Sequence, residues 1–518
     1  MAKSPLSHKC DQPGNTNSFS HFTREDGAYK WNTILRGFLE RNDPKKAILG
    51  FAHMRRRGIK ADSYALLFVI KACGLIMPGV FEGKQMHAQA LKLGFGSEVV
   101  TQTALLRMYC LFGDLLAAQK VFDETPQRDI IQWNALISIF AQRDHPNIAI
   151  RAARAMVNEN VRPDEVTVVS IVSACTRLKA LEHGKQVHGY ATKNLSGFDA
   201  FVRNALINMY AQCGCLSNAH HVFEKMSCRN VVSWTSIING YGENGRPSEA
   251  LALFKEMETA GVRPDEVTVL AVVSMCTKLG SSEIGEWIDE YVKKNGFQEN
   301  INIMNALIDM HSKCGNIEKA CQIFDQMTER TLISWTAIIQ GLAMHGYGVA
   351  ALVRFSQMQR EGFKPDDIVF LSVMNACSHA GLVVEGKQCF ESMAEEHGMT
   401  PSIEHWGSMV DLLCRAGLLG EAFQFLVSMP VKPDAVIWRT LIGACRDQGN
   451  ISLARQVMDY VLDLEPEHSG NYILKSNLHA VVGDWDGVHE VRNDMGFREV
   501  TTKRDPAHSY IEAQHNVI

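Results

Sequence analysis

The sequence has few cysteines, no long apolar run and no large charge of either sign. Its 518 residues include 14 cysteines, well below the density of a disulfide scaffold, and no stretch near the start has the pattern of a secretory signal, so we expect a reducing compartment. The longest apolar stretches, such as residues 166–174, are about half as long as a membrane span, so we expect no contact with a membrane. The formal net charge of −5 argues against nucleic-acid binding through bulk positive potential, so any such binding must come from a local surface.

Signatures of catalysis are also absent. A zinc-dependent nucleobase deaminase needs H-x-E and P-C-x-x-C to hold the metal and move protons, and neither motif occurs. The sequence lacks G-x-x-x-x-G-K-[ST], G-x-S-x-G and H-E-x-x-H as well. Cys213 and Cys215 form a C-x-C without a paired histidine, so we expect no metal site there. We predict no active site, no enzymatic activity and no cofactor.

The remaining composition is that of a folded protein. Hydrophobic residues make up 46% and charged residues 21%, which excludes a disordered or collagen-like chain. At roughly 100 to 200 residues per domain, the length predicts several globular units or one long array. Residues 1–27 contain six Ser or Thr and no apolar face, which predicts a disordered N-terminus or a transit peptide.

The dominant feature is internal repetition. Tryptophans recur about every 101 residues, at Trp31, Trp133, Trp234, Trp335 and Trp438. The motifs GKQMH at 83–87 and GKQVH at 184–188 repeat with the same period, as do NVRPD ending at Asp164 and GVRPD ending at Asp265. Each long period divides into three, because VRNALINMY at 202–210 resembles QWNALISIF at 132–140. A period of this kind predicts a repeat architecture.

The shorter units have lengths of 35, then 35 or 36, then 31 or 32 residues. They are residues 28–62, 63–98, 99–129, 130–164, 165–199, 200–230, 231–265, 266–300, 301–331, 332–366, 367–402 and 403–434, followed by related segments from 435 to about 495.

Within a unit the apolar spacing is helical. In 231–265, Ile237, Ile238 and Tyr241 are followed, after a break at Gly242, Gly245 and Pro247, by a second apolar series: Ala250, Leu251, Phe254 and Met257. This pattern predicts two amphipathic helices of three to four turns, and the Pro-Asp pair at the unit's end predicts the turn into the next unit. One hairpin cannot bury both apolar faces, so we predict an all-α solenoid with a concave face lined by the first helices.

These lengths and the markers WNALI, GKQVH, MYAQCG, VFEKM and GVRPD resemble the pentatricopeptide repeat (PPR) family. The order of unit lengths resembles the P-L-S triplets of its PLS subfamily, found chiefly in land plants. The resemblance covers residues 28 to about 512, with the array at 28–434. It implies a right-handed superhelix of helix-turn-helix repeats and localisation in a plant organelle, mitochondrion or chloroplast.

Residues 435–495 resemble the E-type extension of that subfamily, and the tail at 496–518 resembles a degenerate form of the segment that follows it. The tail has Ala507, His508 and Tyr510 where the family usually shows Gly, Cys and Trp. Within the extension, Lys475 and His479 occupy positions that are usually apolar or aromatic. A weakened contact surface is one reading of these departures.

A small hydrogen-bonding residue is fifth in seven of the P and S units. These residues are Asn32, Thr103, Asn134, Asn204, Thr235, Asn305 and Thr336. On the first turn of a helix, an amide or hydroxyl can reach a base edge that is exposed only in unpaired RNA. The last residues of the same units are also polar: Asp62, Asp129, Asp164, Asn230, Asp265, Thr331 and Asp366.

The second residues of these units are mostly apolar and suited to contact with base faces. They are Tyr29, Val100, Ile131, Phe201, Val232 and Ile333, with Asn302 as the exception. A purely structural alternative exists for the last residues, because Asp, Asn and Thr are favoured helix caps. It explains the fifth residues poorly, because Asn and Thr are not strong helix formers.

The resemblance implies one base per repeat, with Thr and Asp preferring G, Asn and Asp preferring U, and two Asn preferring a pyrimidine, often C. In chain order this gives U-n-G-U-n-C-G-n-Y-G, read 5′ to 3′. The n positions are the long units, whose fifth residues are Leu67, Val169, Leu270 and Leu371 and cannot hydrogen-bond a base edge. We expect these units to act as spacers, with a loose steric role left open.

Two other recurrent residue types have structural interpretations. Cys73, Cys175, Cys276 and Cys377 recur with the long period, and Cys445 lies 68 residues further, which predicts small buried packing residues. His87 and His188 belong to the GKQ-x-H motif, but Asp289 and Phe390 replace them in the later copies. We expect surface or interhelix groups at all four positions.

The sequence therefore predicts single-stranded RNA binding by a site-recognition factor for cytidine-to-uridine editing in a plant organelle. The resemblance implies that its partners are organellar RNA, a DYW-type deaminase recruited in trans, and organellar editing accessory proteins. An RNA-protecting or splicing factor is a second hypothesis. A helical scaffold that binds protein is a third, from another functional class.

Overall fold

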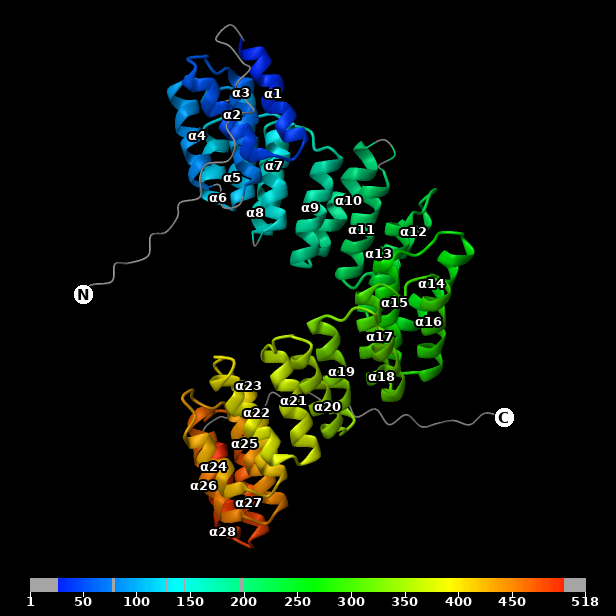
Figure 1. The fold of residues 1–518 in the computed structure, drawn as a ribbon, viewed down its shortest axis with the longest axis vertical. Coiled ribbons are helices and arrows are strands. Elements are labelled where there is room, and N and C mark those ends of the chain that lie inside the picture. Colours follow the sequence, from blue (N-terminus) through cyan, green and yellow to red (C-terminus); the bar gives the residue numbers. More distant parts are fainter. Residues whose placement is uncertain are drawn as a thin grey trace, which may run out of the picture. The chain divides into compact units, whose positions relative to one another are not determined.

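The computed structural model describes residues 27–76, 80–125, 128–143, 145–195, 197 and 199–497. The predictions for the N-terminal segment before Gly27 and for the tail from residue 498 lie outside these residues. Within them the regular elements are 28 α-helices, and the chain divides into two compact units, Met1–Arg263 and Pro264–Ile518 (Figure 1). Unit 1 contains α1 to α14 and unit 2 contains α15 to α28.

The helices of unit 1 alternate between the first and second helix of each repeat. They are α1 (Ala28–Glu40), α2 (Pro44–Arg56), α3 (Ser63–Leu75), α4 (Val80–Lys92), α5 (Val99–Phe112), α6 (Leu115–Asp123), α7 (Ile130–Gln142), α8 (Pro146–Asn158), α9 (Glu165–Leu178), α10 (Leu181–Asn194), α11 (Ala200–Gln212), α12 (Leu216–Glu224), α13 (Val231–Glu243) and α14 (Pro247–Thr259).

The helices of unit 2 follow the same alternation. They are α15 (Glu266–Leu279), α16 (Ser282–Lys294), α17 (Ile301–Lys313), α18 (Ile317–Gln326), α19 (Leu332–Met344), α20 (Gly348–Arg360), α21 (Asp367–Ala380), α22 (Val383–Glu395), α23 (Ile403–Arg415), α24 (Leu419–Val427), α25 (Ala435–Asp447), α26 (Ile451–Leu464), α27 (Ser469–Val481) and α28 (Trp485–Phe497).

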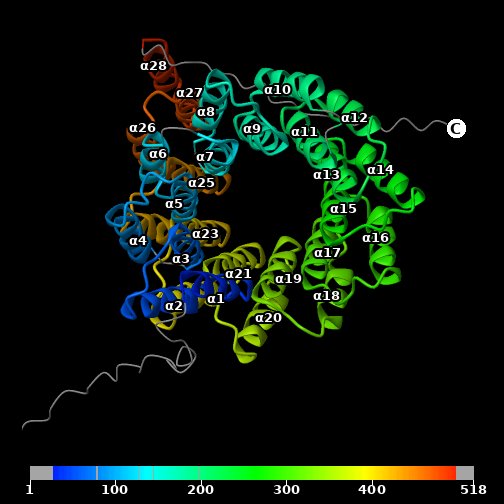
Figure 2. The same ribbon diagram turned by 90° about the horizontal axis from the view of Figure 1, so that it is seen from above.

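Each unit has two layers of helices. Every odd-numbered helix packs against the next odd-numbered helix, from α1 to α13 in unit 1 and from α15 to α25 in unit 2. Each even-numbered helix packs against the first helix of its own repeat, so the second helices form the other layer (Figure 2). This arrangement confirms the predicted all-α solenoid, in which neighbouring hairpins supply the core that one hairpin lacks.

The 31- and 32-residue repeats are short because their second helices are short. Helices α6, α12 and α24 have nine residues and α18 has ten, whereas the second helices of the other repeats have 13 or 14. The first helices keep 13 or 14 residues throughout. The length cycle therefore leaves unchanged the helical layer that carries the second and fifth residues.

Repeat 231–265 shows how the helix boundaries arise. Its two helices have 13 residues each, which confirms the predicted lengths. The predicted break is wrong at Gly242, which is buried inside α13; the chain turns at residues 244–246, where Gly245 has a φ of 74°. Pro247 is the first residue of α14, where its missing N–H has no helical partner to lose.

The recurrent tryptophans pack at the junctions between short and following repeats. In three junctions a tryptophan ring packs edge to face on a phenylalanine ring, with ring centres 4.7 Å apart. The pairs are Phe122 with Trp133, Phe223 with Trp234, and Phe324 with Trp335. An arginine guanidinium covers the same phenylalanine in each case, at 4.8, 4.6 and 4.8 Å for Arg128, Arg229 and Arg330. These three clusters, which we call the junction clusters, give the 101-residue period a physical cause in aromatic and cation–π packing.

The predictions for cysteine and histidine are confirmed. Cys73, Cys175, Cys276 and Cys377 are fully buried, and burial raises the pKa of the Cys73 thiol to about 12. The Nδ1 atoms of His87 and His188 lie 2.8 and 2.9 Å from the hydroxyls of Tyr109 and Tyr210 on the next first helix, so these histidines are interhelix groups.

The later copies of this position change chemistry but keep the interhelix role. Asp289 is 5% exposed, and its carboxylate lies 3.0 Å from the ammonium groups of both Lys293 and Lys319. Phe390 packs edge to face on Trp406, with ring centres 4.9 Å apart. Repeats therefore exchange a polar contact for a charged or aromatic one without changing the helix packing.

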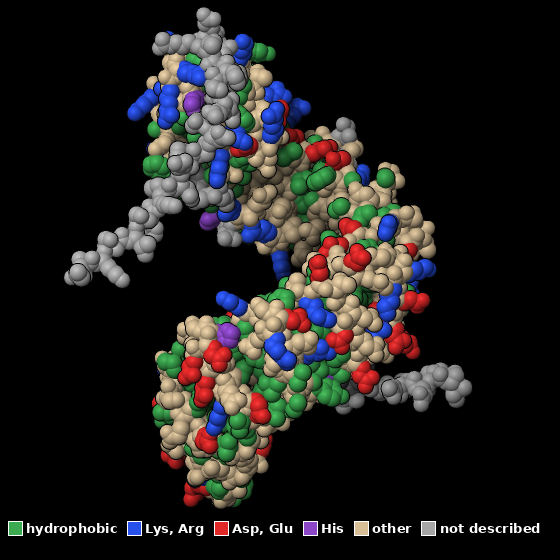
Figure 3. All heavy atoms as spheres, in the orientation of Figure 1, with side chains coloured by type: hydrophobic (Ala, Val, Ile, Leu, Met, Phe, Trp, Pro, Cys, Tyr) green, Lys and Arg blue, Asp and Glu red, His purple; other side chains and the backbone are tan. Residues whose placement is uncertain are grey.

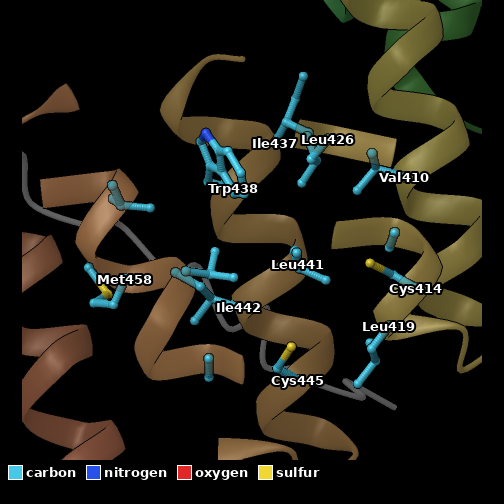
Figure 4. Packing of buried hydrophobic residues seen from close by; sticks show 14 of the residues in the cluster. Val410, Cys414, Leu419, Leu426, Ile437, Trp438, Leu441, Ile442, Cys445 and Met458 are labelled. Carbon is cyan, nitrogen blue, oxygen red and sulfur yellow. The ribbon is translucent and has the colours of Figure 1, made fainter. Parts of the chain in front are cut away.

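The segment predicted as an E-type extension continues the helical stack. Helices α25 to α28 form two further hairpins, and one apolar core runs from α23 to α27. Cys414, Trp438, Leu441 and Met458 belong to it (Figure 4). Lys475 contacts Asp459 at 3.5 Å, and His479 contacts Asp484 at 2.8 Å. The two departures from the family pattern are thus accommodated by carboxylates of the same extension.

Candidate nucleic-acid interface

The second residue of most first helices projects apolar surface into solvent; the exceptions are Asn302, Glu404 and Gly470. Tyr29 is 83% exposed and Phe201 76% exposed, and Val100, Ile131, Val232 and Ile333 are also exposed. Large apolar side chains that recur at one exposed register along a layer contribute little to the core. Such a row is available for flat apolar faces of a ligand.

The sequence interpretation missed that the long repeats carry the same feature. Their second residues, Tyr64, Val166, Val267 and Ile368, are between 55% and 58% exposed. The signal was present in the sequence, because these residues hold the same register as Tyr29. The row is interrupted at Asn302, whose Nδ2 donates to Glu266 Oε1 at 2.9 Å and whose amide replaces an apolar side chain.

The fifth and last residues of one repeat, which we call its reading pair, are predicted to contact one base together. In two repeats the two side chains of the pair are joined by hydrogen bonds. Asn32 Nδ2 lies 3.1 and 2.8 Å from the two carboxylate oxygens of Asp62. Asn134 Nδ2 lies 3.0 and 3.1 Å from those of Asp164. The two residues of each pair are 30 apart in the sequence. They meet because the last residue of a repeat caps the first helix of the following repeat, and that helix packs on the first helix of its own repeat's predecessor.

The threonines at the fifth position make a different contact. The hydroxyls of Thr103, Thr235 and Thr336 donate to the main-chain carbonyl four residues earlier, at 2.7, 2.8 and 2.8 Å. A hydroxyl that has donated its proton in this way offers an acceptor to any further partner. Asn and Thr at the fifth position therefore present different hydrogen-bonding groups.

The last residues all cap the helix that follows them. Asp62, Asp129, Asp164, Asn230, Asp265, Thr331 and Asp366 each accept from the main-chain N–H three residues on, at 2.8 to 3.4 Å. The capping alternative thus describes a real role, worth about 1 kcal/mol per helix. It does not exclude the other role, because Asp62 and Asp164 cap a helix and bind the fifth residue at once.

Several fifth residues carry a polar atom without a partner. The side-chain oxygens of Asn32, Asn204 and Asn305 are buried and make no hydrogen bond among the residues described. Such groups are rare in native proteins because each costs about 1 to 3 kcal/mol. Other unpartnered buried atoms lie elsewhere among the described residues, including the indole nitrogens of Trp133 and Trp234. The three asparagine oxygens are therefore groups that a ligand could satisfy, but they do not by themselves define a site.

A hollow at the first two repeats shows the arrangement as a whole. It is lined by Tyr29, Asn32, Thr33, Arg36, Glu40, Tyr64 and Phe68. The amide of Asn32 therefore shares one cavity with the exposed rings of two successive second residues. This is a site for a flat group with a polar edge.

Some repeats depart from the pattern. The fifth residues of the long repeats, Leu67, Val169, Leu270 and Leu371, are partly buried and apolar. A further short repeat, 403–434, has Gly407 at the fifth position, so the Asn or Thr rule covers seven of the eight P and S repeats. The equivalent residue of the extension is Arg439, which forms an ion pair with Glu465 and donates to Asn471 Oδ1 at 3.1 Å.

Charge is distributed unevenly between the two units. Unit 1 contains 32 Lys and Arg against 23 Asp and Glu, a formal charge of +9, and unit 2 contains 20 against 34, a formal charge of −14. In Figure 3, basic side chains gather over the N-terminal helices and acidic ones over the C-terminal helices. The small net charge of the chain therefore conceals a basic unit suited to a polyanion.

Neither a metal site nor a membrane span emerges from the described parts of the chain. No three His, Cys, Asp or Glu side chains in residues 27–497, outside the gaps given above, are grouped so as to hold a metal ion. None of the helices there combines the length and apolar character of a transmembrane segment.

Comparisons with known proteins agree with this architecture. The PPR repeat model matches residues 30–59, 100–130, 201–231, 303–332, 333–363, 368–397 and 404–432, and a PPR repeat family model matches 229–278. The E motif model matches residues 448–512, which overlaps the extension predicted at 435–495 and continues beyond it.

Proteins of Arabidopsis thaliana are similar over nearly the whole chain. The pentatricopeptide repeat-containing protein At4g38010 is 36% identical over 94% of this chain and 86% of its own. The chloroplastic protein At1g08070 is 37% identical over 91% of this chain and 68% of its own, and the mitochondrial protein At2g22410 is 33% identical over 93% and 76%. The chain belongs to the pentatricopeptide repeat family, and its repeat order and E motif are those of the PLS subfamily, E subgroup.

Solved structures share the fold. The crystal structure of the pentatricopeptide repeat protein PPR10 in complex with an 18-nucleotide psaJ RNA element aligns with a TM-score of 0.63 at 17% identity, over 91% of this chain and 85% of that one. PPR10 from maize aligns with a TM-score of 0.53 at 18% identity, over 91% and 80%. At this level of identity the likeness establishes a common helical-repeat fold.

Proposed function

We propose that the chain binds single-stranded RNA, with each P or S repeat facing one base through its fifth and last residues. The observation that carries the proposal is the hydrogen-bonded pairing of Asn32 with Asp62 and of Asn134 with Asp164 beside exposed second residues. The base edges of unpaired RNA are free for such contacts, and the apolar row supports the base faces. The related fold of PPR10, which was crystallised with RNA, supports the same reading.

The hydrogen-bonding groups favour particular bases. An asparagine held by an aspartate offers an N–H to a carbonyl oxygen of uracil, whereas a threonine whose proton is already donated offers an acceptor to the N–H groups of guanine. This chemistry agrees with the preferences that the family resemblance implies. We propose the recognition sequence U-n-G-U-n-C-G-n-Y-G, with the long repeats as spacers.

We further propose that the chain selects sites for cytidine-to-uridine editing in a plant mitochondrion or chloroplast. The E motif supports this role, and relatives are named as chloroplastic or mitochondrial proteins. A DYW-type deaminase would act in trans, together with organellar accessory proteins. Protection or splicing of the same RNA is the second candidate, because it needs the binding face alone.

Selection from a randomised single-stranded RNA pool tests the binding proposal. The wild-type chain is expected to enrich the sequence above, and Asn134→Thr is expected to change the preferred base at the fourth position from U toward G. Leu67→Ala is the matched control, since it alters a fifth residue of a long repeat and should leave every base preference unchanged. Absence of any retained RNA would instead favour the protein-binding scaffold.

The editing role needs a second experiment. Transcripts from plants that lack the chain are compared with wild-type transcripts at cytidines just downstream of sequences that match the selected one. Loss of conversion at one such cytidine is expected. Normal conversion with a shortened or unspliced transcript would favour the protecting or splicing role.

A further inference from the structure

Two repeats have the same reading pair but different surroundings. Repeats 28–62 and 130–164 both combine an asparagine at the fifth position with an aspartate at the last. The third residue of the next first helix differs, because it is Ala65 after the first pair and Thr167 after the second. A rule based on the pair alone assigns both repeats the same selectivity.

In repeat 130–164 both ends of the asparagine amide are occupied. Asn134 Nδ2 donates to Asp164, and Asn134 Oδ1 accepts from Thr167 Oγ1 at 2.5 Å. The Thr167 hydroxyl is fully buried and accepts from the main-chain N–H of Asp164 at 3.2 Å. It also lies 2.9 Å from Asp164 Oδ1, so its single proton is shared between that oxygen and the nearer Asn134 Oδ1. Because a carboxylate only accepts hydrogen bonds, the nitrogen must face Asp164 and the oxygen must face Thr167.

In repeat 28–62 only one end of the amide is occupied. Asn32 Nδ2 donates to both oxygens of Asp62, but Asn32 Oδ1 is buried and makes no hydrogen bond among the described residues. Ala65 is buried at the place equivalent to Thr167 and has no hydroxyl to offer. This oxygen gains a partner if the amide turns toward a donor on a bound base.

We propose that Thr167 is a positioning residue that makes repeat 130–164 discriminate uracil from cytosine more sharply than repeat 28–62 does. Uracil has a carbonyl oxygen at the ring position where cytosine has an amino group. An amide locked by Thr167 offers an N–H, which pairs with the carbonyl and opposes the amino group. Turning the Asn32 amide to offer its oxygen to the amino group breaks only its bonds to Asp62, whereas turning the Asn134 amide also breaks the bond to Thr167. Repeat 28–62 should therefore tolerate cytosine better than repeat 130–164 does. The inference rests on the proposed function, since it assumes that each repeat faces one base.

A second pair of residues shows that the contact between the third residue of one first helix and the fifth residue of the preceding first helix recurs with other side chains. In the extension, Asn471 is third in α27 and Arg439 is fifth in α25, and Arg439 Nε donates to Asn471 Oδ1 at 3.1 Å. Different side chains thus meet at the same two positions. The third residue of a first helix is consequently placed to act on the fifth residue of the preceding one.

Binding of the full chain to matched RNAs tests the proposal. Two pairs of RNA carry the recognition sequence with U or C at the fourth position, read by Asn134, or at the first position, read by Asn32. Thr167→Val keeps the shape and removes the hydroxyl, and it is expected to lower the U-over-C ratio of affinities at the fourth position about fivefold, the value of one neutral hydrogen bond. Thr167→Ser restores the hydroxyl and should keep the ratio.

The reciprocal change supplies a gain of selectivity. Ala65→Thr is expected to raise the U-over-C ratio at the first position, whereas Ala65→Val adds similar volume without a hydroxyl and should not. These variants keep the test decisive if Thr167→Val folds poorly. Thermal unfolding of each variant measures stability, and a purely structural effect would weaken binding to U and C alike.

The outcomes separate the two proposals. An unchanged ratio in both Thr167→Val and Ala65→Thr, with a wild-type chain that still selects its sequence, overturns the role of Thr167 and leaves RNA binding standing. A wild-type chain that retains no RNA overturns the proposed function and this inference with it.

Discussion

The two units share the same packing of helices and differ in the side chains on their surfaces. Both stack first helices in one layer, and both close a short-to-following repeat junction with the same Phe, Trp and Arg cluster. Unit 1 has a formal charge of +9 and aromatic second residues at Tyr29, Tyr64 and Phe201. It also contains the two repeats in which a fifth-position asparagine is hydrogen-bonded to the last aspartate. Unit 2 has a formal charge of −14, an amide at Asn302, and no side chain at Gly407.

The comparison shows that the second residues, which are proposed to contact RNA, vary between the units while the core residues remain apolar. Substitution at the exposed second residues leaves the core unchanged, because the core residues lie on other faces of the helices. The fifth residues are more enclosed, and Thr235 and Asn305 are buried. Binding strength can therefore vary along the array while the fold stays uniform. We expect the RNA to be held more tightly by unit 1 than by unit 2.

The largest expected effect tests the shared packing of helices. Phe223→Ala in unit 1 and Phe324→Ala in unit 2 each remove a buried ring from a junction cluster, and each should lower the free energy of unfolding by about 3 to 5 kcal/mol. Chemical denaturation measures both. A large loss in one unit with little in the other would show that the helix packing of the two units is not equivalent.

The next effect tests the unequal binding. Abasic nucleotides are placed opposite repeats 99–129 and 130–164 in one RNA, and opposite repeats 301–331 and 332–366 in another. Since one base stack contributes about 1 to 3 kcal/mol, the first RNA should lose about 30-fold in affinity and the second about threefold. Equal losses of affinity would mean that the different surface residues of the two units do not change the free energy of RNA binding.

A smaller effect tests the interrupted row. Asn302→Val restores an apolar second residue in unit 2 and frees Glu266 from its hydrogen bond, so affinity for RNA should rise about threefold. Val100→Asn makes the reverse change in an equivalent short repeat of unit 1 and should lower affinity by a similar factor. Fluorescence anisotropy at one fixed salt concentration compares the two variants.

The smallest effect concerns pH. Burial lowers the pKa of His188 below its usual value near 6.5, so the folded chain favours the neutral ring. The stabilisation is complete above that value and is lost as the pH falls below it, because the unfolded chain takes up a proton more readily. Unfolding free energies at about pH 7.5 and pH 5.5 should differ less in His188→Phe than in the wild type. An equal difference would exclude this histidine as a source of the dependence.

Much of this could be predicted from the sequence, for a physical reason. Helical spacing of apolar residues and Pro-Asp stops act locally, so the two-helix pattern of repeat 231–265 followed from them. Gly242 lies inside α13 because packing overrides its low helix propensity. The packing roles of Cys73 and His87 also followed, from recurrence alone. The exposure of Tyr64 and its equivalents did not follow from the apolar spacing, because an apolar residue near a helix start can face either the core or solvent, and only the packing of neighbouring helices decides which.

The sequence by itself determined the helical repeat, its order of lengths and the residue types at the positions proposed to contact RNA, because these depend on local periodicity. Tertiary structure alone decided which of those residues meet. Asn32 and Asn134 look alike in the sequence, yet one amide has a buried oxygen without a partner and the other is held by Thr167, 33 residues away. That difference arises from the stacking of successive first helices, which brings the start of one helix against the fifth residue of the helix before it.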